Sequence, residues 1–378
     1  MRGSGYLLRI PVIDISEVGA GGGSIAYLDP AGALRVGPQS AGAVPGPVCY
    51  GQGNSAPTVT DANLVLGFLH DGALAGGALQ VDRALAASAI QTTIAAPFDL
   101  PLHEAAYGIH DIANSNMVRA IKSVSVERGR DPADFTLMAF GGAGPIHAAG
   151  VARALGIHNI IIPPAPGLFS ALGLLRAEVE HHTTRTVLTS TQDADLDALQ
   201  TVLDEMVADL YARIREEGFD DDAITYRVLL DMRYTGQSSE LMVPFPSLRV
   251  TADTLRHAEE AFEAEFERMY SHRAERKVFE LVNCHLVATV ARGIEPQAQW
   301  TYASDGGPTA MSQRQVYFGP EFEALNTTIL TRAMLDDQPR SGPIVIEEYD
   351  STVVVPPDCQ VSCDPQGNLI IDLSVAQT

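Results

Sequence analysis

The residues best suited to chemistry form a glycine-rich turn between two regular elements. The apolar run Leu137–Phe140 predicts a buried strand, and Pro145 is typical of the first turn of a helix, where the N–H that proline lacks would be unpaired. Glycine gives the turn between them access to positive φ and lets a ligand approach closely. The free N–H groups at the start of the helix attract anions. We expect the following residues to face a nucleotide, although packing alone also makes such turns glycine-rich: Gly141, Gly142, Ala143 and Gly144.

Asp61 is the acidic candidate. It belongs to Thr58–Asn63, a segment that predicts the start of a helix running to about Leu69. Thr60 or Asp61 suits the N-cap position, because a side-chain oxygen there accepts hydrogen bonds from the first turn. Alternatively, the Asp61 carboxylate faces the glycine turns, as a catalytic group or as the ligand of a divalent cation. In that case we expect Thr60 and Asn63 to line the same cleft.

A second glycine run, Gly19–Ser24, follows a short strand expected over 10–18. It lacks the third glycine of a dinucleotide-binding fingerprint, because position 24 is serine. Residues 25–37 predict strand, turn and strand instead of the helix that such a site needs. We therefore exclude a Rossmann site. Glycine before a hairpin still lets the backbone pack against a flat or charged group, so we expect a contact with the cofactor at Gly21, Gly22 and Gly23.

Proline and glycine dominate residues 37–53, which excludes a helix or a central strand there. The stretch is too apolar for a flexible linker. It predicts an ordered loop folded over a site or, alternatively, a brace between domains.

A long helix is predicted over His103–Arg128, with apolar residues at three-four spacing and Gly129 at its end. The middle of this helix carries a polar cluster of His110, Asp111, Asn114 and Asn116. The cluster either lines a cleft or forms a solvated face of the helix. Asn114 is the cleft candidate from this helix. His147, from the helix after the first glycine turn, either contacts a ligand or simply lies near the helix start.

Two strand–turn–helix units follow each other, because Ile157–Pro163 predicts a strand and 164–173 a turn that enters a helix. Such units imply adjacent parallel strands, and ligands bind beyond the carboxyl ends of those strands, where both turns lie. A composition change near Arg185 precedes alternating helices and strands: helices over 193–218 and 255–270, strands over 226–234, 240–244 and 277–292, and a β-rich segment from Gln313 onward.

Composition narrows the class of protein. With 378 residues, of which 46% are hydrophobic, the chain is globular and long enough for two or three domains. It has no run of about 20 apolar residues, and its first residues resemble no signal peptide, so we expect no membrane partner. A net charge of −22 repels nucleic acid. Cys359 and Cys363 could meet on adjacent strands, but a reduced pair in a cytoplasmic protein is the better expectation.

Taken in order, these motifs resemble the hydantoinase A/5-oxoprolinase family of ATP-dependent enzymes. Relatives in that family include the ATP-binding subunits of acetone and acetophenone carboxylases and of caprolactamase. The matching stretches cover nearly the whole chain: 19–26, 36–43, 45–51, 58–63, 140–147, 233–241 and 342–350.

The resemblance implies a fold similar to that of actin, Hsp70 and sugar kinases, in which two halves enclose ATP and each supplies an Asp-Gly-Gly-Thr phosphate turn. This chain contains no Asp-Gly-Gly-Thr and resembles the C-terminal half of the family, starting just after the expected second phosphate turn. We expect an α/β fold with two domains. Residues 1–185 would form a partial actin-like nucleotide-binding domain, and residues 186–378 an α+β, β-rich C-terminal domain.

The resemblance also implies the chemistry. ATP, with Mg²⁺ or another divalent cation, phosphorylates an unreactive amide or carbonyl oxygen, and the resulting ester is attacked by water or another nucleophile. We expect a subunit or fragment of a hydantoinase/5-oxoprolinase-type enzyme that hydrolyses a cyclic amide. Its partners would be a hydantoinase B-like subunit and, if the gene is split, a separate N-terminal half. The alternatives are the ATP-binding subunit of an acetone or acetophenone carboxylase-type complex, and a non-catalytic scaffold or truncated fragment.

Overall fold

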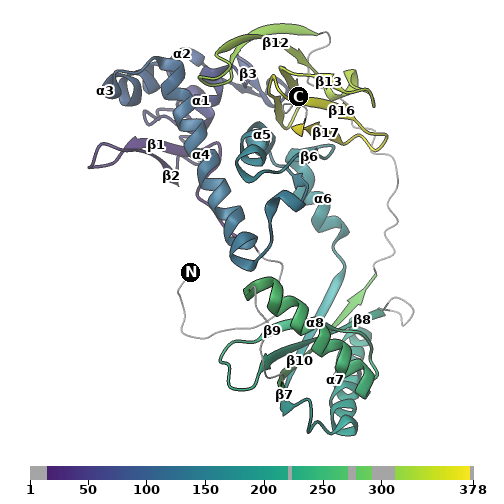
Figure 1. Ribbon diagram of the computed structural model, residues 1–378. Coiled ribbons are helices and arrows are strands. Elements are labelled where there is room, and N and C mark those ends of the chain that lie inside the picture. Colours follow the sequence, from purple (N-terminus) through teal and green to yellow (C-terminus); the bar gives the residue numbers. More distant parts are fainter. Residues whose placement is uncertain (1–14, 220–223, 271–277, 292–310, 375–378) are drawn as a thin grey trace. The chain divides into compact units, whose positions relative to one another are not determined.

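A computed structural model describes residues 15–219, 224–270, 278–291 and 311–374 (Figure 1). Contacts group these residues into two compact units, one made of 15–175 with 311–374 and the other of 176–291. The last strands of the chain therefore pack with its first part. The domain division expected from the sequence, 1–185 and 186–378, stays a prediction.

The larger unit begins with the predicted hairpin. Strands β1 (Ser24–Leu28) and β2 (Leu34–Ser40) are antiparallel, as the pattern after the glycine run indicates. Of the strand expected over 10–18, residues 10–14 lie outside the described residues and residues 15–18 form no strand. The proline- and glycine-rich loop contains one 3-10 turn, Val48–Tyr50, and leads to helix α1 (Val59–Leu66).

Helix α4 (Leu102–Val124) packs its apolar face on the core around α1. It ends four residues earlier than predicted, and a 3-10 turn over Val126–Arg128 fills the gap before Gly129. Several short elements join the two helices: β3 (Ala73–Leu74), β4 (Leu79–Gln80), α2 (Arg83–Ile90) and α3 (Ala96–Phe98).

A five-stranded sheet contains the predicted parallel pair. Strands β5 (Leu137–Met138) and β6 (Asn159–Ile162) are parallel, and helix α5 (Gly144–Leu155) connects them. The strand order is β13-β16-β17-β6-β5, and β6 pairs antiparallel with β17 from the end of the chain (Figure 1). The remaining strands and the helix after β6 are β13 (Arg340–Ser341), β16 (Gln360–Cys363), β17 (Leu369–Asp372) and α6 (Phe169–Arg176).

The expectation that 137–140 forms a buried strand is wrong. Met138 is 47% exposed and Phe140 is 44% exposed. The reason is position in the sheet, because β5 is an edge strand with a neighbour on one side only.

A four-stranded sheet completes the larger unit and confirms the β-rich end of the chain. Its order is β11-β12-β14-β15, with β12 and β14 parallel. All residues of β14 and β15 are buried, which fits their runs of β-branched side chains. The strands are β11 (Ser312–Tyr317), β12 (Ala324–Leu330), β14 (Ile344–Glu347) and β15 (Thr352–Val355).

The second unit is an antiparallel sheet with two helices on its apolar face. Met206, Leu210 and Phe262 of the helices lie in one core with alternate residues of the strands. Five elements confirm the helices and strands predicted after Arg185: α7 (Leu196–Glu216), β8 (Ile224–Tyr234), β9 (Leu241–Phe245), α8 (Ala252–Tyr270) and β10 (Phe279–Val290). Residues 277 and 292 of the last predicted strand lie outside the described residues. Strand β7 (Val179–Ser190), which runs through Arg185, was not predicted.

All four cysteines are free thiols, including Cys359 and Cys363. Among the described helices none combines the length and apolar character that a membrane crossing requires.

Candidate functional site

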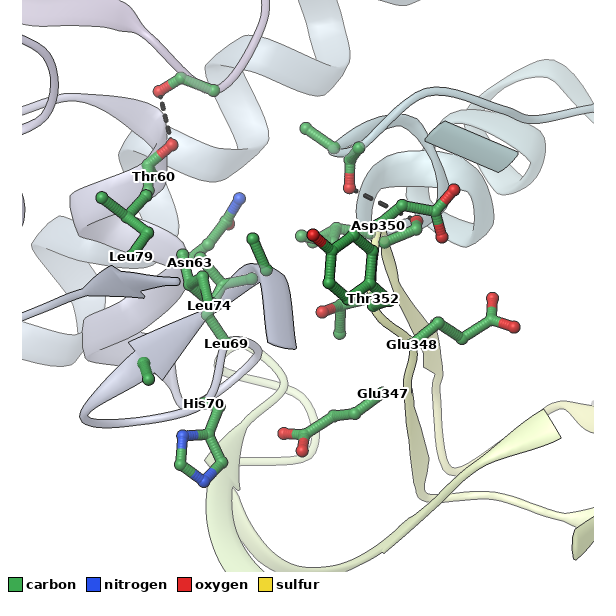
Figure 2. A pocket seen from close by; sticks show the side chains of 18 of the residues that line it. Thr60, Asn63, Leu69, His70, Leu74, Leu79, Glu347, Glu348, Asp350 and Thr352 are labelled. Atoms are coloured by element: carbon green, nitrogen blue, oxygen red, sulfur yellow. Dashed lines mark hydrogen bonds between the residues drawn. The ribbon is translucent and has the colours of Figure 1, made fainter. Parts of the chain in front are cut away.

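A cleft of about 900 Å³ opens in the larger unit and has two unlike walls (Figure 2). One wall comes from the glycine run, α1 and the β3–β4 hairpin. The other comes from the end of β14, the start of β15 and the turn before α5. In Figure 2 the labelled side chains lie on the two sides accordingly: Thr60, Asn63, Leu69, His70, Leu74 and Leu79 opposite Glu347, Glu348, Asp350 and Thr352.

Gly22 is hydrogen-bonded to the start of α1. Its carbonyl oxygen accepts hydrogen bonds from the backbone N–H and the hydroxyl of Thr60, at 2.8 and 2.9 Å. A Cβ on Gly22 would lie 2.7 Å from Thr60 Oγ1, so this approach requires glycine. Gly22, Gly23 and Thr60 all line the cleft, and Gly21 does not.

The N-cap of α1 is Thr58, and the expectation of Thr60 or Asp61 is wrong. Thr58 Oγ1 accepts from the backbone N–H of Asp61, and Asp61 accepts from the backbone N–H of Thr58, which makes a reciprocal capping box. Asp61 is thus the third residue of the helix. The spacing Thr58-Val-Thr-Asp61 matches the capping-box pattern, a signal in the sequence that identifies Thr58 as the N-cap.

Asp61 is fully buried and its carboxylate has four donors. They are the backbone N–H groups of Val48 at 3.1 Å, Cys49 at 2.7 Å and Thr58 at 2.8 Å, and the Thr58 hydroxyl at 2.8 Å. Asp61 is not among the residues that line the cleft. Burial, together with the neighbouring Asp61 charge, raises the pKa of the Cys49 thiol far above its ordinary range. This geometry supports a structural role for Asp61, in the capping box and in holding the loop, and its catalytic and metal roles stay predictions.

The opposite wall is bound to both predicted glycine turns. The Ser351 hydroxyl lies 3.4 Å from Gly141 O and 3.3 Å from Gly142 O, to which it donates. Asp350 Oδ2 accepts from the backbone N–H of Gly167 at 2.9 Å. A Cβ on Gly167 would lie 2.8 Å from Asp350 O, so the second turn also needs glycine. The segment 348–351 therefore meets the carboxyl ends of both β5 and β6.

Two other carboxylates of this wall are paired with arginines. Glu347 binds Arg314 at 2.5 Å, and Glu348 binds Arg332 through two hydrogen bonds of 2.6 and 2.8 Å. Arg332 also donates to the carbonyl oxygens of Ile162, Pro163 and Gly367. Within the described ranges, no group of three or more His, Cys, Asp and Glu residues is placed to hold a metal ion.

The first glycine turn uses its glycines differently from the prediction. Only Gly141 has positive φ, at +85°, and Gly142 and Gly144 do not. Gly142 and Ala143 line the cleft, whereas Gly141 and Gly144 do not. Helix α5 begins at Gly144 with Pro145 in its first turn, as predicted.

The mid-helix polar cluster of α4 divides into buried and accessible members. His110 and Asn114 are buried, while Asp111 is exposed and Asn116 donates its amide to Val36 O at 3.0 Å. Asn114 lines a second cavity of about 880 Å³ instead of the cleft. Sequence reasoning noticed His110 but did not select it.

His110 and His147 form a buried stacked pair, each held by an asparagine. Their ring centroids are 4.5 Å apart and their planes differ by 16°. His110 Nδ1 lies 2.8 Å from Asn63 Oδ1, and His147 Nδ1 lies 2.7 Å from Asn114 Oδ1. Burial lowers the pKa of His147 to about 4 and, with the His147 ring adding to it, holds the pKa of His110 well below its ordinary value. His147 does not line the cleft; Asn63 does.

Family models, curated relatives and a solved structure are all similar to this chain over nearly its whole length. A family model described as hydantoinase/oxoprolinase matches residues 1–183, and the hydantoinase/oxoprolinase C-terminal domain matches residues 188–372. An uncharacterised protein of Methanocaldococcus jannaschii is 40% identical over 98% of this chain and 53% of its own length.

Two further relatives carry functional names. Caprolactamase subunit alpha of Pseudomonas jessenii is 36% identical over 96% of this chain and 53% of its own. The crystal structure of the ATP-dependent caprolactamase from that organism superposes with a TM-score of 0.83 at 35% identity, covering 94% of this chain and 52% of the other. The acetophenone carboxylase gamma subunit of Aromatoleum aromaticum is 34% identical over 97% of this chain and 52% of its own. The chain spans about half the length of these relatives.

Proposed function

We propose, from the premise that the chain belongs to the hydantoinase/oxoprolinase family, that it is one part of an enzyme that uses ATP to hydrolyse a cyclic amide. The similarity to the ATP-dependent caprolactamase over 94% of the chain supports the reaction class. Because the chain spans only about half of that protein's length, the proposed activity is that of a larger protein or assembly.

The observation that carries the proposal is that glycine lines both walls of the cleft, with Gly22 and Gly23 on one wall and Gly142 on the other. Ser351 and Asp350 bind the turns that follow β5 and β6, and Gly22 and Gly23 face the cleft from the other side. Glycine backbone on both walls leaves room for a flat or charged ligand to approach closely. This is the location expected for a nucleotide at the carboxyl ends of parallel strands.

The proposed reaction transfers the γ-phosphoryl group of ATP to the amide oxygen and releases ADP. Water then adds to the activated carbon, the C–N bond of the ring breaks, and a second water releases phosphate. Positioning and charge stabilisation are what a protein contributes to such a transfer. The fold is proposed to be half of an actin-like pair, and the phosphate turns would come from the other half, since this sequence has none.

Mg²⁺ would neutralise phosphate charge in this reaction. The described residues fit a metal poorly, because Glu347 and Glu348 are paired with arginines and the Asp61 oxygens already accept four hydrogen bonds. We therefore propose no metal site held by the residues that the structure describes. The proposed partners are a hydantoinase B-like subunit and an N-terminal half of the hydantoinase A type, in the cytoplasm.

A carboxylase subunit is the second candidate, favoured by the 34% identity to the acetophenone carboxylase gamma subunit. The phosphoryl step would be the same, and the substrate would be a ketone. The test is co-expression with the proposed partners, followed by ATP hydrolysis assays with lactams and with ketones plus bicarbonate. Stimulation by lactams alone supports the hydrolase, stimulation by ketones with bicarbonate supports the carboxylase, and no stimulation by either favours a non-catalytic role.

A further inference from the structure

The Asn63 side chain has one end fixed and one end free. Its oxygen lies 2.8 Å from His110 Nδ1. Its amide nitrogen has no hydrogen-bonding partner in the part of the chain that the structure describes. Figure 2 shows that nitrogen turned toward the opening between Thr60 and Asp350. A hydrogen-bond donor is thus presented to the cleft.

The contact with His110 ties the orientation of the Asn63 amide to the tautomer of His110. A carboxamide oxygen only accepts hydrogen bonds, so His110 Nδ1 must carry the proton that it donates to Asn63 Oδ1. The Asn63 NH₂ group is then left on the cleft side. If His110 Nδ1 were unprotonated, Asn63 would have to turn its NH₂ inward and present its oxygen to the cleft.

His147 braces this arrangement from α5. The His147 ring stacks on the His110 ring, and the Nδ1 atom of His147 is hydrogen-bonded to Asn114. The edge of Phe68 and the ring of Tyr107 enclose the His110 ring on its other sides. Tyr107 contacts His110 as well, and burial lowers the pKa of both histidines. Both rings therefore lie where a charge would be poorly solvated, and each remains neutral.

We propose that Asn63 binds the ligand of the cleft by donating from Nδ2 to a ligand oxygen, and that His110 and His147 are positioning residues that hold this amide in place. The proposal rests on the proposed function for the identity of the ligand. The oxygen belongs either to a nucleotide phosphate or to the carbonyl of a cyclic amide. A lost hydrogen bond to a charged oxygen weakens binding ten- to a hundredfold, and one to an uncharged oxygen about three- to tenfold.

The test is an NMR titration of the full ¹⁵N-labelled chain with ATP and, separately, with caprolactam. The Asn63 NH₂ resonances are assigned by their loss in Asn63→Ala. The proposal predicts that one ligand shifts these resonances and that Asn63→Ala weakens binding of that ligand by the factor above. The matched control is Asn116→Ala, because it removes the hydrogen bond from a side-chain amide to Val36 O but takes no donor from the cleft. This variant should bind the ligand as the wild type does.

Two His110 variants test positioning separately from folding. His110→Leu removes the donor to Asn63, whereas His110→Asn places an amide near the position of Nδ1 and retains it. We expect His110→Leu to weaken binding to the level of Asn63→Ala and His110→Asn to restore it, with thermal unfolding of each variant measured alongside. Equal binding by His110→Leu and the wild type would overturn the positioning role.

The outcomes also separate this inference from the proposed function. If ATP or caprolactam shifts the backbone resonances of Gly22 and Gly142 but leaves the Asn63 NH₂ unmoved, the inference fails and the proposed function stands. If neither compound shifts any residue of the cleft in the chain alone or binds the co-expressed complex, both fail.

Discussion

Asp61 Oδ1 accepts a 2.7 Å hydrogen bond from the backbone N–H of Cys49, a residue of the proline- and glycine-rich loop. The other oxygen of the same carboxylate accepts from Val48 and Thr58. One buried side chain therefore holds the loop against the start of α1. The residue that the sequence offered as catalytic is, in the structure, the anchor of the cleft's first wall.

Asp61→Asn should destabilise the larger unit. An amide has one accepting oxygen, and its NH₂ group would face a backbone N–H that now lacks a partner. Since hydrogen bonds to a buried charged group contribute about 1.5–3 kcal/mol each, we expect a loss of about 3 kcal/mol in the free energy of unfolding. Urea denaturation measures this directly.

Asp71→Asn is the matched control, because Asp71 lines the same cleft but is exposed. It should change the free energy of unfolding by less than about 0.5 kcal/mol. If Asp61→Asn were as stable as Asp71→Asn yet inactive in the assembled enzyme, the catalytic interpretation of Asp61 would be favoured instead.

Gly22→Ala should cost stability that Gly21→Ala does not. The new methyl group would lie 2.7 Å from Thr60 Oγ1, whereas a Cβ on Gly21 meets nothing within 4 Å. Overpacking of this kind costs about 1–3 kcal/mol, and Gly21→Ala should be neutral or slightly stabilising. Thermal unfolding of the two variants side by side checks this, and equal melting temperatures would show that the Gly22–Thr60 contact is easily relaxed.

The stacked histidines should make the protein less stable in mild acid. In the unfolded chain both histidines have pKa values of about 6.5, while in the folded protein the pKa of His147 is about 4 and that of His110 is well below 6.5. Between about pH 6.5 and 4 the unfolded state therefore binds more protons, and the free energy of unfolding falls as the pH falls. Each residue contributes up to about 1.4 kcal/mol per pH unit in that range.

His147→Asn isolates this effect, because it retains a donor toward Asn114 but does not titrate. Urea denaturation at pH 7.5, 6 and 5 should show a shallower pH dependence than the wild type. His70→Asn, at an exposed position in the cleft, should leave the slope as it is. A wild-type slope in His147→Asn would show that the pair is not the source of acid sensitivity.

Gly142→Val should weaken nucleotide binding with little effect on folding. Gly142 lines the cleft without needing positive φ, and its Cβ would meet Asp350 O at an ordinary 3.5 Å. The two added methyl groups would occupy cleft volume, so we expect at least tenfold weaker ATP binding. Gly144→Ala, with open space around its Cβ, is the control.

The wild-type chain alone is expected to bind ATP only in the millimolar range, about 4 kcal/mol, because its sequence has no Asp-Gly-Gly-Thr phosphate turn. Titration of the chain alone and of the assembled complex measures both effects. Micromolar binding by the isolated chain would contradict the assignment of the phosphate clamp to a partner.

Sequence reasoning succeeded where the signal is local. The glycine turn with Pro145, the parallel pair that it joins, and the amphipathic helices all follow from spacing within about 25 residues. It failed where a neighbour comes from far along the chain. Nothing near Leu137 indicates that β5 ends up at a sheet edge, because the strands that complete that sheet are β13, β16 and β17.

The candidate site shows the same division. Thr60 and Asn63 line the cleft, and both were proposed because they lie at the predicted helix start; their contact with a ligand stays a prediction. Ser351 and Asp350 were missed as site residues, although Asp350 ends the stretch 342–350 that resembles the family. Their contacts with Gly142 and Gly167 depend on a register between strands that no periodicity encodes.

The position of β17 has a consequence for how the protein is made. β17 lies between β6 and β16, so β6 lacks its antiparallel partner until the last strand of this sheet has been synthesised. A chain that emerges from the ribosome N-terminus first will carry β5, α5 and β6 through most of synthesis with one strand edge open. Contacts of such long sequence separation slow folding, and open edges invite pairing with other chains. We therefore expect the newly made chain to be prone to mispairing at the edge of β6 until β17 is available.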